Sequence, residues 1–328
     1  MLNNLINIHD FVVLARRIRQ KGMFKALHRV FKPYASRVQT AWEHTESKPI
    51  NWWDIPEVQK RWNYKITGNP DLEKYEYVAQ KYLRQNSNNL RGLSIGCGTG
   101  ISEVKWARTN IFRKLEAFDI SEERISHAQS LAKKERMASC MSFYKADAQK
   151  VAFHQNSLDV AIAEGILHHL APVESIVAKV HQWLKPGGFF VVTEYVGPSR
   201  FQWTKKQLDL VNAILTLLPE KFRRQCDTNE IKKRVYRPGR LSMYLNDPSE
   251  ASESAKILSA LTRYFEILER KDFGGTILQL LFKDIAMNFM NPSEECMKMI
   301  QLCFFLEDCL IEAKEIESDF TFLVCKKL

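Results

Sequence analysis

The residues most suited to chemistry follow short apolar runs in the sequence. Three glycines and two aspartates stand in this order after three such runs: Gly96, Gly98, Gly100, Asp119 and Asp147. A glycine-rich turn lets backbone N–H groups approach a ligand closely. A carboxylate at the end of the second strand can accept hydrogen bonds from both ribose hydroxyls. A carboxylate after the third strand can accept one from an adenine amino group. Together, these residues favour a nucleoside ligand.

Simpler roles exist for the same residues. Asp119 could cap a helix that begins near Ser121, and Asp147 could be a turn residue. The glycine spacing also distinguishes between ligands, because the dinucleotide pattern needs its third glycine three residues after the second. This chain has Ile101 there, which counts against NAD.

A second group of candidates could handle a proton. His168 and His169 follow the apolar run 158–163, and Glu194 and Tyr195 end the run 189–193. Histidine and glutamate can take a proton from a hydroxyl, so His168, His169 and Glu194 are candidate catalytic residues. Alternatively, the histidines pack at the start of a helix and Glu194 is a solvated strand end.

These candidates need a parallel sheet to bring them together. Apolar, strand-like runs recur along the chain at 93–95, 114–118, 141–144, 158–163, 189–193, 265–270 and 320–325. Amphipathic stretches alternate with them, including 101–108, 173–184 and 293–313. Strands that are apolar on both faces indicate a buried parallel sheet. We therefore predict an α/β fold: a doubly wound, Rossmann-like, seven-stranded and mostly parallel sheet, with its ligand at the carboxyl ends of the strands.

Two segments lie outside this alternation. Residues 1–88, basic and then rich in aromatics, are predicted to form an N-terminal helical extension, and 89–328 the main domain. Residues 197–262 are predicted to be an inserted helical lid, with an apolar helix at 201–218 and a capping box at 247–250 that opens its last helix. Such additions commonly build a substrate pocket. Core packing explains such an apolar stripe more often than contact with a ligand does.

Composition restricts the class of protein. With 45% hydrophobic and 26% charged residues in 328, the chain is typical of a globular protein. No apolar run approaches the ~20 residues that span a bilayer, and no signal peptide is recognisable, so we expect a cytoplasmic protein. The seven cysteines include no CxxC pair, which predicts neither a disulfide framework nor a metal site.

Positive charge is concentrated in two zones. The net charge is +10, and residues 1–48 and 221–240 each carry an excess of six positive charges. Within the second zone, Arg237 and Arg240 could bind a phosphate or carboxylate of a substrate, beside Tyr195 and Trp203; the alternative is a solvated basic face. The amphipathic stretch 11–31 could contact an anionic membrane, although packing against the core or a partner is preferred.

Several motifs, in order, carry a family resemblance: LSIGCGTG at 93–100, AFDIS at 117–121, KADA at 145–148, LDVAIAEGILHHL at 158–170 and LKPGGFFVVTE at 184–194. Together they resemble the class I S-adenosylmethionine-dependent methyltransferases of the small-molecule type. The resemblance covers about residues 90–195. It implies S-adenosyl-L-methionine as cofactor, bound by Gly96, Cys97, Gly98, Gly100, Asp119, Ile120, Asp147, Ala148 and Glu164. The glycines would frame the methionine end, Asp119 the ribose, and Asp147 with Ala148 the adenine.

One position departs from the family pattern. The family usually carries an acid two residues before the first glycine, whereas this chain has Ser94. That acid helps to order the amino-acid end of the cofactor. Glu103 could substitute for it.

The resemblance implies methyl transfer, in which the protein mainly positions the acceptor. We expect a small-molecule or carbohydrate acceptor, anionic or lipid-linked, methylated at a hydroxyl. An RNA methyltransferase is one alternative, supported by the basic zones. Against it, residues 163–166 lack the Pro-Pro-aromatic turn of amino-methylating nucleic-acid enzymes, and no RNA-binding module is recognisable. A non-catalytic cofactor-binding or interaction protein is another.

Overall fold

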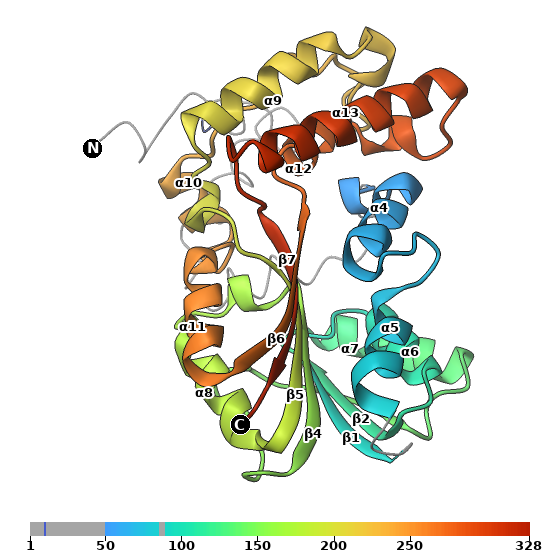
Figure 1. The fold of residues 1–328 in the computed structure, drawn as a ribbon, viewed down its shortest axis with the longest axis vertical. Helices are drawn as coiled ribbons and strands as arrows, with labels where there is room; N and C mark the ends of the chain where they lie inside the picture. The colour runs from blue at the N-terminus through green and yellow to red at the C-terminus, as the bar shows by residue number, and fades with distance from the viewer. Residues whose placement is uncertain (1–9, 11–49, 85–88) are drawn as a thin grey trace.

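The computed structural model describes Asp10, residues 50–84 and residues 89–328. Its centre is a seven-stranded sheet in the order β3-β2-β1-β4-β5-β7-β6 (Figure 1). The strands are β1 (Leu90–Ile95), β2 (Phe112–Asp119), β3 (Met141–Lys145), β4 (Leu158–Glu164), β5 (Leu184–Tyr195), β6 (Glu266–Gly274) and β7 (Phe320–Lys326). Only β7 runs antiparallel to both neighbours. The predicted fold class and all seven predicted strands are confirmed.

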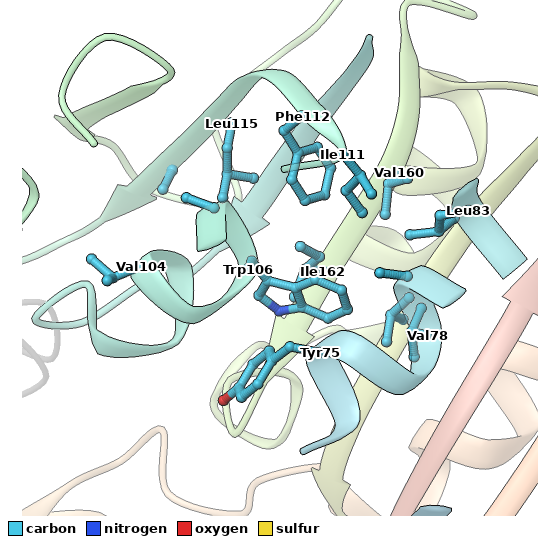
Figure 2. Packing of buried hydrophobic residues seen from close by; sticks show 14 of the residues in the cluster. Tyr75, Val78, Leu83, Val104, Trp106, Ile111, Phe112, Leu115, Val160 and Ile162 are labelled. Atoms are coloured by element: carbon cyan, nitrogen blue, oxygen red, sulfur yellow. The ribbon is translucent and has the colours of Figure 1, made fainter. Parts of the chain in front are cut away.

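One face of the sheet is covered by helices from both the N-terminal part and the main domain (Figure 1). These helices are α5 (Lys74–Val78), the helical turn Ala79–Leu83, α6 (Ile101–Arg108) and α7 (Glu122–Lys134). Figure 2 shows the indole of Trp106 in the middle of this core, where it meets the ring of Tyr75 edge-on at 5.2 Å between centroids. Burial of two such large rings ties α5 to the sheet.

The opposite face is covered by α8 (Val173–Trp183) and α11 (Ile257–Tyr264). Their apolar residues pack with alternate residues of β4 and β5, including Ala161, Phe190 and Val192. Because both faces are covered, the central strands are apolar throughout, as the sequence predicts for a parallel sheet.

A second helical layer lies beyond one end of the sheet (Figure 1). It contains α4 (Pro56–Thr67), α9 (Lys205–Leu217), α12 (Leu278–Phe282) and α13 (Glu294–Glu312), around an apolar core of its own. The apolar stripe predicted at 201–218 is therefore largely packed core. Within the layer, an ion pair joins α4 to α13, because Arg61 contacts the buried Glu307 at 3.0 Å and the half-buried Asp308 at 2.8 Å.

The predicted capping box at 247–250 is wrong. Helix α10 (Arg240–Asn246) ends there, with Asp247 as its C-cap, and the next long helix, α11, begins only at Ile257. Residues 247–253 form a turn, and Asp247 caps the turn itself by accepting a hydrogen bond from the Ser249 N–H at 2.9 Å. The stretch 11–31 lies outside the described residues. In the described part of the chain, no helix is long and apolar enough to span a membrane.

Candidate functional site

A pocket lies at the carboxyl ends of the four parallel strands β1 to β4. Its walls come from every predicted turn, from α7 and from the insertion: Gly96, Phe118, Asp119, Ile120, Arg124, Ala146, Asp147, Ala148, Gly165, Ile166, His169, Leu170 and Ser249. Five of the nine residues that the resemblance assigns to the cofactor line it. Cys97, Gly98, Gly100 and Glu164 are not among the lining residues.

The glycine turn has the shape that only glycine permits at its first and last positions. Gly96 has φ +67°, and a Cβ there would lie 2.3 Å from Ile166 Cγ1. Gly100 has φ +83°, and a Cβ there would lie 2.8 Å from the Ala128 Cβ in α7. At Gly96 and Gly100, both the backbone conformation and the lack of space exclude a side chain. The backbone at these two positions is therefore not covered by a side chain of its own.

Asp119 joins the glycine turn to α7. Its Oδ2 accepts a hydrogen bond from the Gly98 N–H and its Oδ1 one from the Ser121 N–H, both at 2.9 Å. Ser121, not Asp119, is the N-cap of α7, because its Oγ accepts the Arg124 N–H. The carboxylate is buried and lines the pocket, and two backbone donors fix its position there.

The other two acids of the resemblance also have structural partners. Asp147 closes a turn by accepting the Gln149 N–H at 2.9 Å, as the simpler interpretation predicts, and it lines the pocket as well. Glu164, at the end of β4, accepts a hydrogen bond from the Trp106 indole at 2.9 Å and pairs with Lys74 at 2.7 Å. The α5 segment thus reaches the edge of the site.

Ser94 and Glu103 meet behind the glycine turn. The Ser94 hydroxyl donates to Glu103 Oε1 at 2.6 Å, and Glu103 Oε2 is buried without a hydrogen-bond partner among the described residues. Burial raises the pKa of Glu103 to about 8. The chain thus places a carboxyl group beside the position where the family usually has an acid.

Glu194 is neither a solvated strand end nor a free base. Its Oε1 accepts the backbone N–H groups of Ile166 and Leu167, and its Oε2 lies 2.6 Å from His168 Nδ1. The residue is buried, and both oxygens are engaged. Glu194 therefore fixes the histidine-bearing turn after β4 and directs His168 Nε2 away from itself.

The two histidines converge on an acid of the insertion. His168 Nε2 lies 3.7 Å and His169 Nε2 4.0 Å from Glu250 Oε1, and His169 Nδ1 lies 3.4 Å from Ser249 Oγ. Burial opposes charge on His168, but Glu194 more than compensates and the pKa of His168 is raised. Burial lowers the pKa of His169 well below its usual value and raises the pKa of Glu250.

Several residues of this region were not predicted from the sequence, among them Arg124 and Ser249 of the pocket wall and Glu250 beside the histidines. Glu250 lies about 80 residues after the histidines, and its only local signal matches a helix cap. The turn 247–253 is held on the histidines because the Ser252 N–H donates to the His168 carbonyl at 3.1 Å. Arg200 adds a second attachment by donating to the Pro248 carbonyl at 2.6 Å.

The predicted substrate residues are only partly brought together. Tyr195 is buried, and the centroid of its ring lies 6.1 Å from that of His168. Phe201 lies between Tyr195 and Trp203: its ring meets that of Tyr195 edge-on and stacks on that of the buried Trp203, both at 5.1 Å between centroids. Arg237 is half-buried and Arg240 is exposed on α10; neither is part of the pocket wall described above.

The basic zone of the insertion is not one surface. Lys232 is buried and donates hydrogen bonds to the carbonyls of Leu280, Leu281 and Lys283 at the end of α12. Burial lowers its pKa to about 7. This lysine, which the sequence groups with the substrate arginines, instead fixes the end of a helix.

Comparison with known proteins agrees with this geometry. Residues 93–192 match the family described as methyltransferase domain. An uncharacterised chloroplastic methyltransferase of Arabidopsis thaliana is 29% identical over 147 residues, which is 43% of this chain and 41% of the relative. Sterol 24-C-methyltransferase of Saccharomyces cerevisiae is 29% identical over 125 residues, 37% of this chain and 32% of the relative. The matched part thus spans less than half of these relatives.

A solved structure shares the fold. Geranyl diphosphate C-methyltransferase from Streptomyces coelicolor, solved with Mg²⁺, a substrate analogue and S-adenosyl-L-homocysteine, superimposes with a TM-score of 0.51 at 13% identity, covering 91% of this chain and 99% of that one. The matched motifs, the strand order and the pocket agree with the family cofactor, S-adenosyl-L-methionine. Residues 93–192 thus match the methyltransferase domain family, and the strand order of the sheet is that of the Rossmann-like methyltransferase fold.

Proposed function

We propose that the protein transfers the methyl group of S-adenosyl-L-methionine to a hydroxyl group of a small organic acceptor. The observation that carries this proposal is the position of the histidines: His169 lines the cofactor pocket, and His168 is fixed beside it by Glu194. A hydroxyl that attacks the methyl carbon has to lose its proton, so it needs a proton-accepting or charge-stabilising group close to the cofactor.

Different residues of the site would bind different parts of the cofactor. Asp119 would accept hydrogen bonds from the ribose, and Asp147 with Ala148 would meet the adenine. The bare backbone of Gly96 to Gly100 would frame the methionine end, whose ammonium Glu103 would pair with. The cofactor supplies the electrophilic methyl group. The chain holds the cofactor and acceptor in line and excludes water from them.

Glu194 is a positioning residue in this proposal. In the neutral form of His168, Nδ1 would donate its proton to Glu194, and Nε2 would then carry the lone pair on the side of Glu250. Tyr195 and Trp203 are proposed to flank an aromatic or sugar ring of the acceptor. Arg237 and Arg240 are proposed as secondary contacts for an anionic group further out.

A second candidate is methylation at carbon of an isoprenoid. The sterol 24-C-methyltransferase and the geranyl diphosphate C-methyltransferase described above favour it. The aromatic row of Tyr195, Phe201 and Trp203 supports it, because aromatic faces stabilise the carbocation that forms on an alkene. The two candidates share the cofactor site and differ in the atom that receives the methyl group.

The first experiment is calorimetric titration of the full chain with S-adenosyl-L-homocysteine. Asp119→Asn removes the negative charge and replaces one carboxylate oxygen with an amide donor, so the side chain can no longer accept hydrogen bonds from both ribose hydroxyls. Asp159→Asn is the matched control, because Asp159 accepts the Arg91 N–H and pairs with Lys185 away from the pocket. We expect saturable binding by wild type and the control, weakened at least tenfold in Asp119→Asn. No binding by folded wild type would refute the proposal.

The acceptor atom is then determined with methyl-labelled cofactor and a panel of phenols, sugars and isoprenoid alcohols. A product labelled at an O-methyl group supports the hydroxyl proposal. A C-methyl signal in the product spectrum would establish the second candidate instead.

A further inference from the structure

Three side chains from two distant parts of the chain face one another beside the cofactor pocket. His168 and His169 come from the turn after β4, and Glu250 comes from the turn of the insertion. One nitrogen from each ring and one carboxylate oxygen all lie within 4.8 Å of one another. We propose that these residues bind a divalent transition metal ion, with Zn²⁺ as the best match.

The distances between the three groups are longer than hydrogen bonds and somewhat longer than the separations between the ligands of a bound metal ion. The separations of 3.7 and 4.0 Å from Glu250 Oε1 to the two Nε2 atoms exceed the 2.7–3.2 Å range of hydrogen bonds. Ligand atoms that each lie about 2.1 Å from a tetrahedral zinc are roughly 3.4 Å apart. A small inward movement of the side chains therefore completes a three-ligand site.

The surroundings orient the ligands. Glu194 Oε2, at 2.6 Å from His168 Nδ1, leaves the Nε2 lone pair to face the metal, as carboxylates behind metal-binding histidines commonly do. Ser249 Oγ lies 3.4 Å from His169 Nδ1 and in turn donates to Asp247. Both rings thus have a partner behind them and present Nε2 to Glu250.

The ligand set indicates the kind of site. Two imidazoles and one carboxylate form a nitrogen and oxygen set that suits zinc, and three protein ligands leave the fourth position open. His169 and Ser249 also line the cofactor pocket, so that open position lies close to the cofactor. An acceptor can reach it without displacing a protein ligand.

The open position gives the hydroxyl of the acceptor a role, a step that rests on the proposed function. A hydroxyl bound to Zn²⁺ loses its proton more readily, and the proton leaves to water. The resulting oxygen attacks the methyl carbon, the O–C bond forms, and the C–S bond breaks to release S-adenosyl-L-homocysteine. The metal would thus perform the deprotonation that the proposed function assigns to this place.

The test measures metal binding directly. Chelator-treated full-length protein is titrated with Zn²⁺ against a competing chromophoric chelator, and separately with Co²⁺, whose visible absorption reports tetrahedral coordination. We expect one tight site in wild type. In Glu250→Gln and His168→Gln, Zn²⁺ affinity should fall at least 100-fold and the Co²⁺ band should disappear.

Matched variants separate a metal site from general damage. Glu253→Gln alters the same turn at an acid that accepts the Val173 N–H outside the site, and it should bind like wild type. Glu194→Gln should weaken Zn²⁺ binding by about 10- to 100-fold, as loss of a ligand-orienting carboxylate does. Each variant is also titrated with S-adenosyl-L-homocysteine to show that it is folded.

The outcomes distinguish this inference from the proposed function. If wild type binds S-adenosyl-L-homocysteine but no Zn²⁺, or if Glu250→Gln binds Zn²⁺ like wild type, the metal site is refuted and the methyltransferase proposal stands. Stoichiometric Zn²⁺ binding without S-adenosyl-L-homocysteine binding would refute the proposed function and leave the metal site.

Discussion

Replacing Glu103 with glutamine should stabilise the protein, and increasingly so as the pH rises. The carboxyl group is buried, with one hydrogen bond from Ser94 and a second oxygen without a partner among the described residues. Ionising it therefore removes a charge from water without an opposite charge beside it. Glutamine has nearly the same shape, is never charged, and can still accept the Ser94 hydrogen bond.

The sign of the pH dependence follows from the raised pKa. The pKa of Glu103 rises from 4.5 to about 8 on folding. Below pH 4.5 the group is protonated in both states and its contribution to stability is complete. Between pH 4.5 and about 8 the unfolded state loses the proton while the folded state keeps it, so the free energy of unfolding falls by about 1.4 kcal/mol per pH unit.

Urea unfolding of wild type and Glu103→Gln at pH 5.5, 6.5 and 7.5 measures this effect. The advantage of the variant should grow by about 3 kcal/mol across that range, from about 1.4 kcal/mol per pH unit. Glu116→Gln, at a carboxylate paired with Arg91, is the control and should show no such growth. A difference between Glu103→Gln and wild type that does not change with pH would refute the argument.

The same substitution should damage cofactor binding. An ionised Glu103 is proposed to pair with the ammonium of the cofactor, so S-adenosyl-L-homocysteine should bind wild type more tightly as the pH rises from 6 towards about 8. Glu103→Gln should bind about tenfold more weakly at pH 8, without this pH dependence. Equal affinity for the two proteins would exclude Glu103 from the cofactor site.

Two further substitutions test the fold. Arg61→Met leaves the buried Glu307 without its cation, so the free energy of unfolding measured in urea should fall by about 3 kcal/mol. Lys60→Met, at an exposed ion pair, should lower it by less than about 1 kcal/mol. Similar losses in the two variants would contradict this reasoning. Gly100→Ala combines a positive φ with a clash against Ala128, whereas Gly68→Ala has a similar φ of +82° and open space. Gly100→Ala should therefore lose about 1–3 kcal/mol more stability than Gly68→Ala, and weaken cofactor binding; equal losses would refute the clash.

The sequence was sufficient to predict the sheet and part of the pocket at its edge. Parallel strands buried on both faces must be apolar along their whole length, so the runs that became β1 to β5 are visible without a structure. The pocket residues of these strands follow directly after the runs, because the carboxyl ends of parallel strands meet at one edge. Gly96, Asp119 and Asp147 are therefore brought together by the fold class itself.

Only the tertiary structure shows that Glu194, His168, His169 and Glu250 lie together. Glu194 resembles an exposed strand end in the sequence, and only the turn after β4, folded back onto it, supplies the two N–H groups and the imidazole that it holds. Glu250 resembles a helix cap, because its short-range pattern fits one. Its approach to His168 and His169 depends on where the insertion docks, and contacts between residues 80 apart leave no periodic trace in a single sequence.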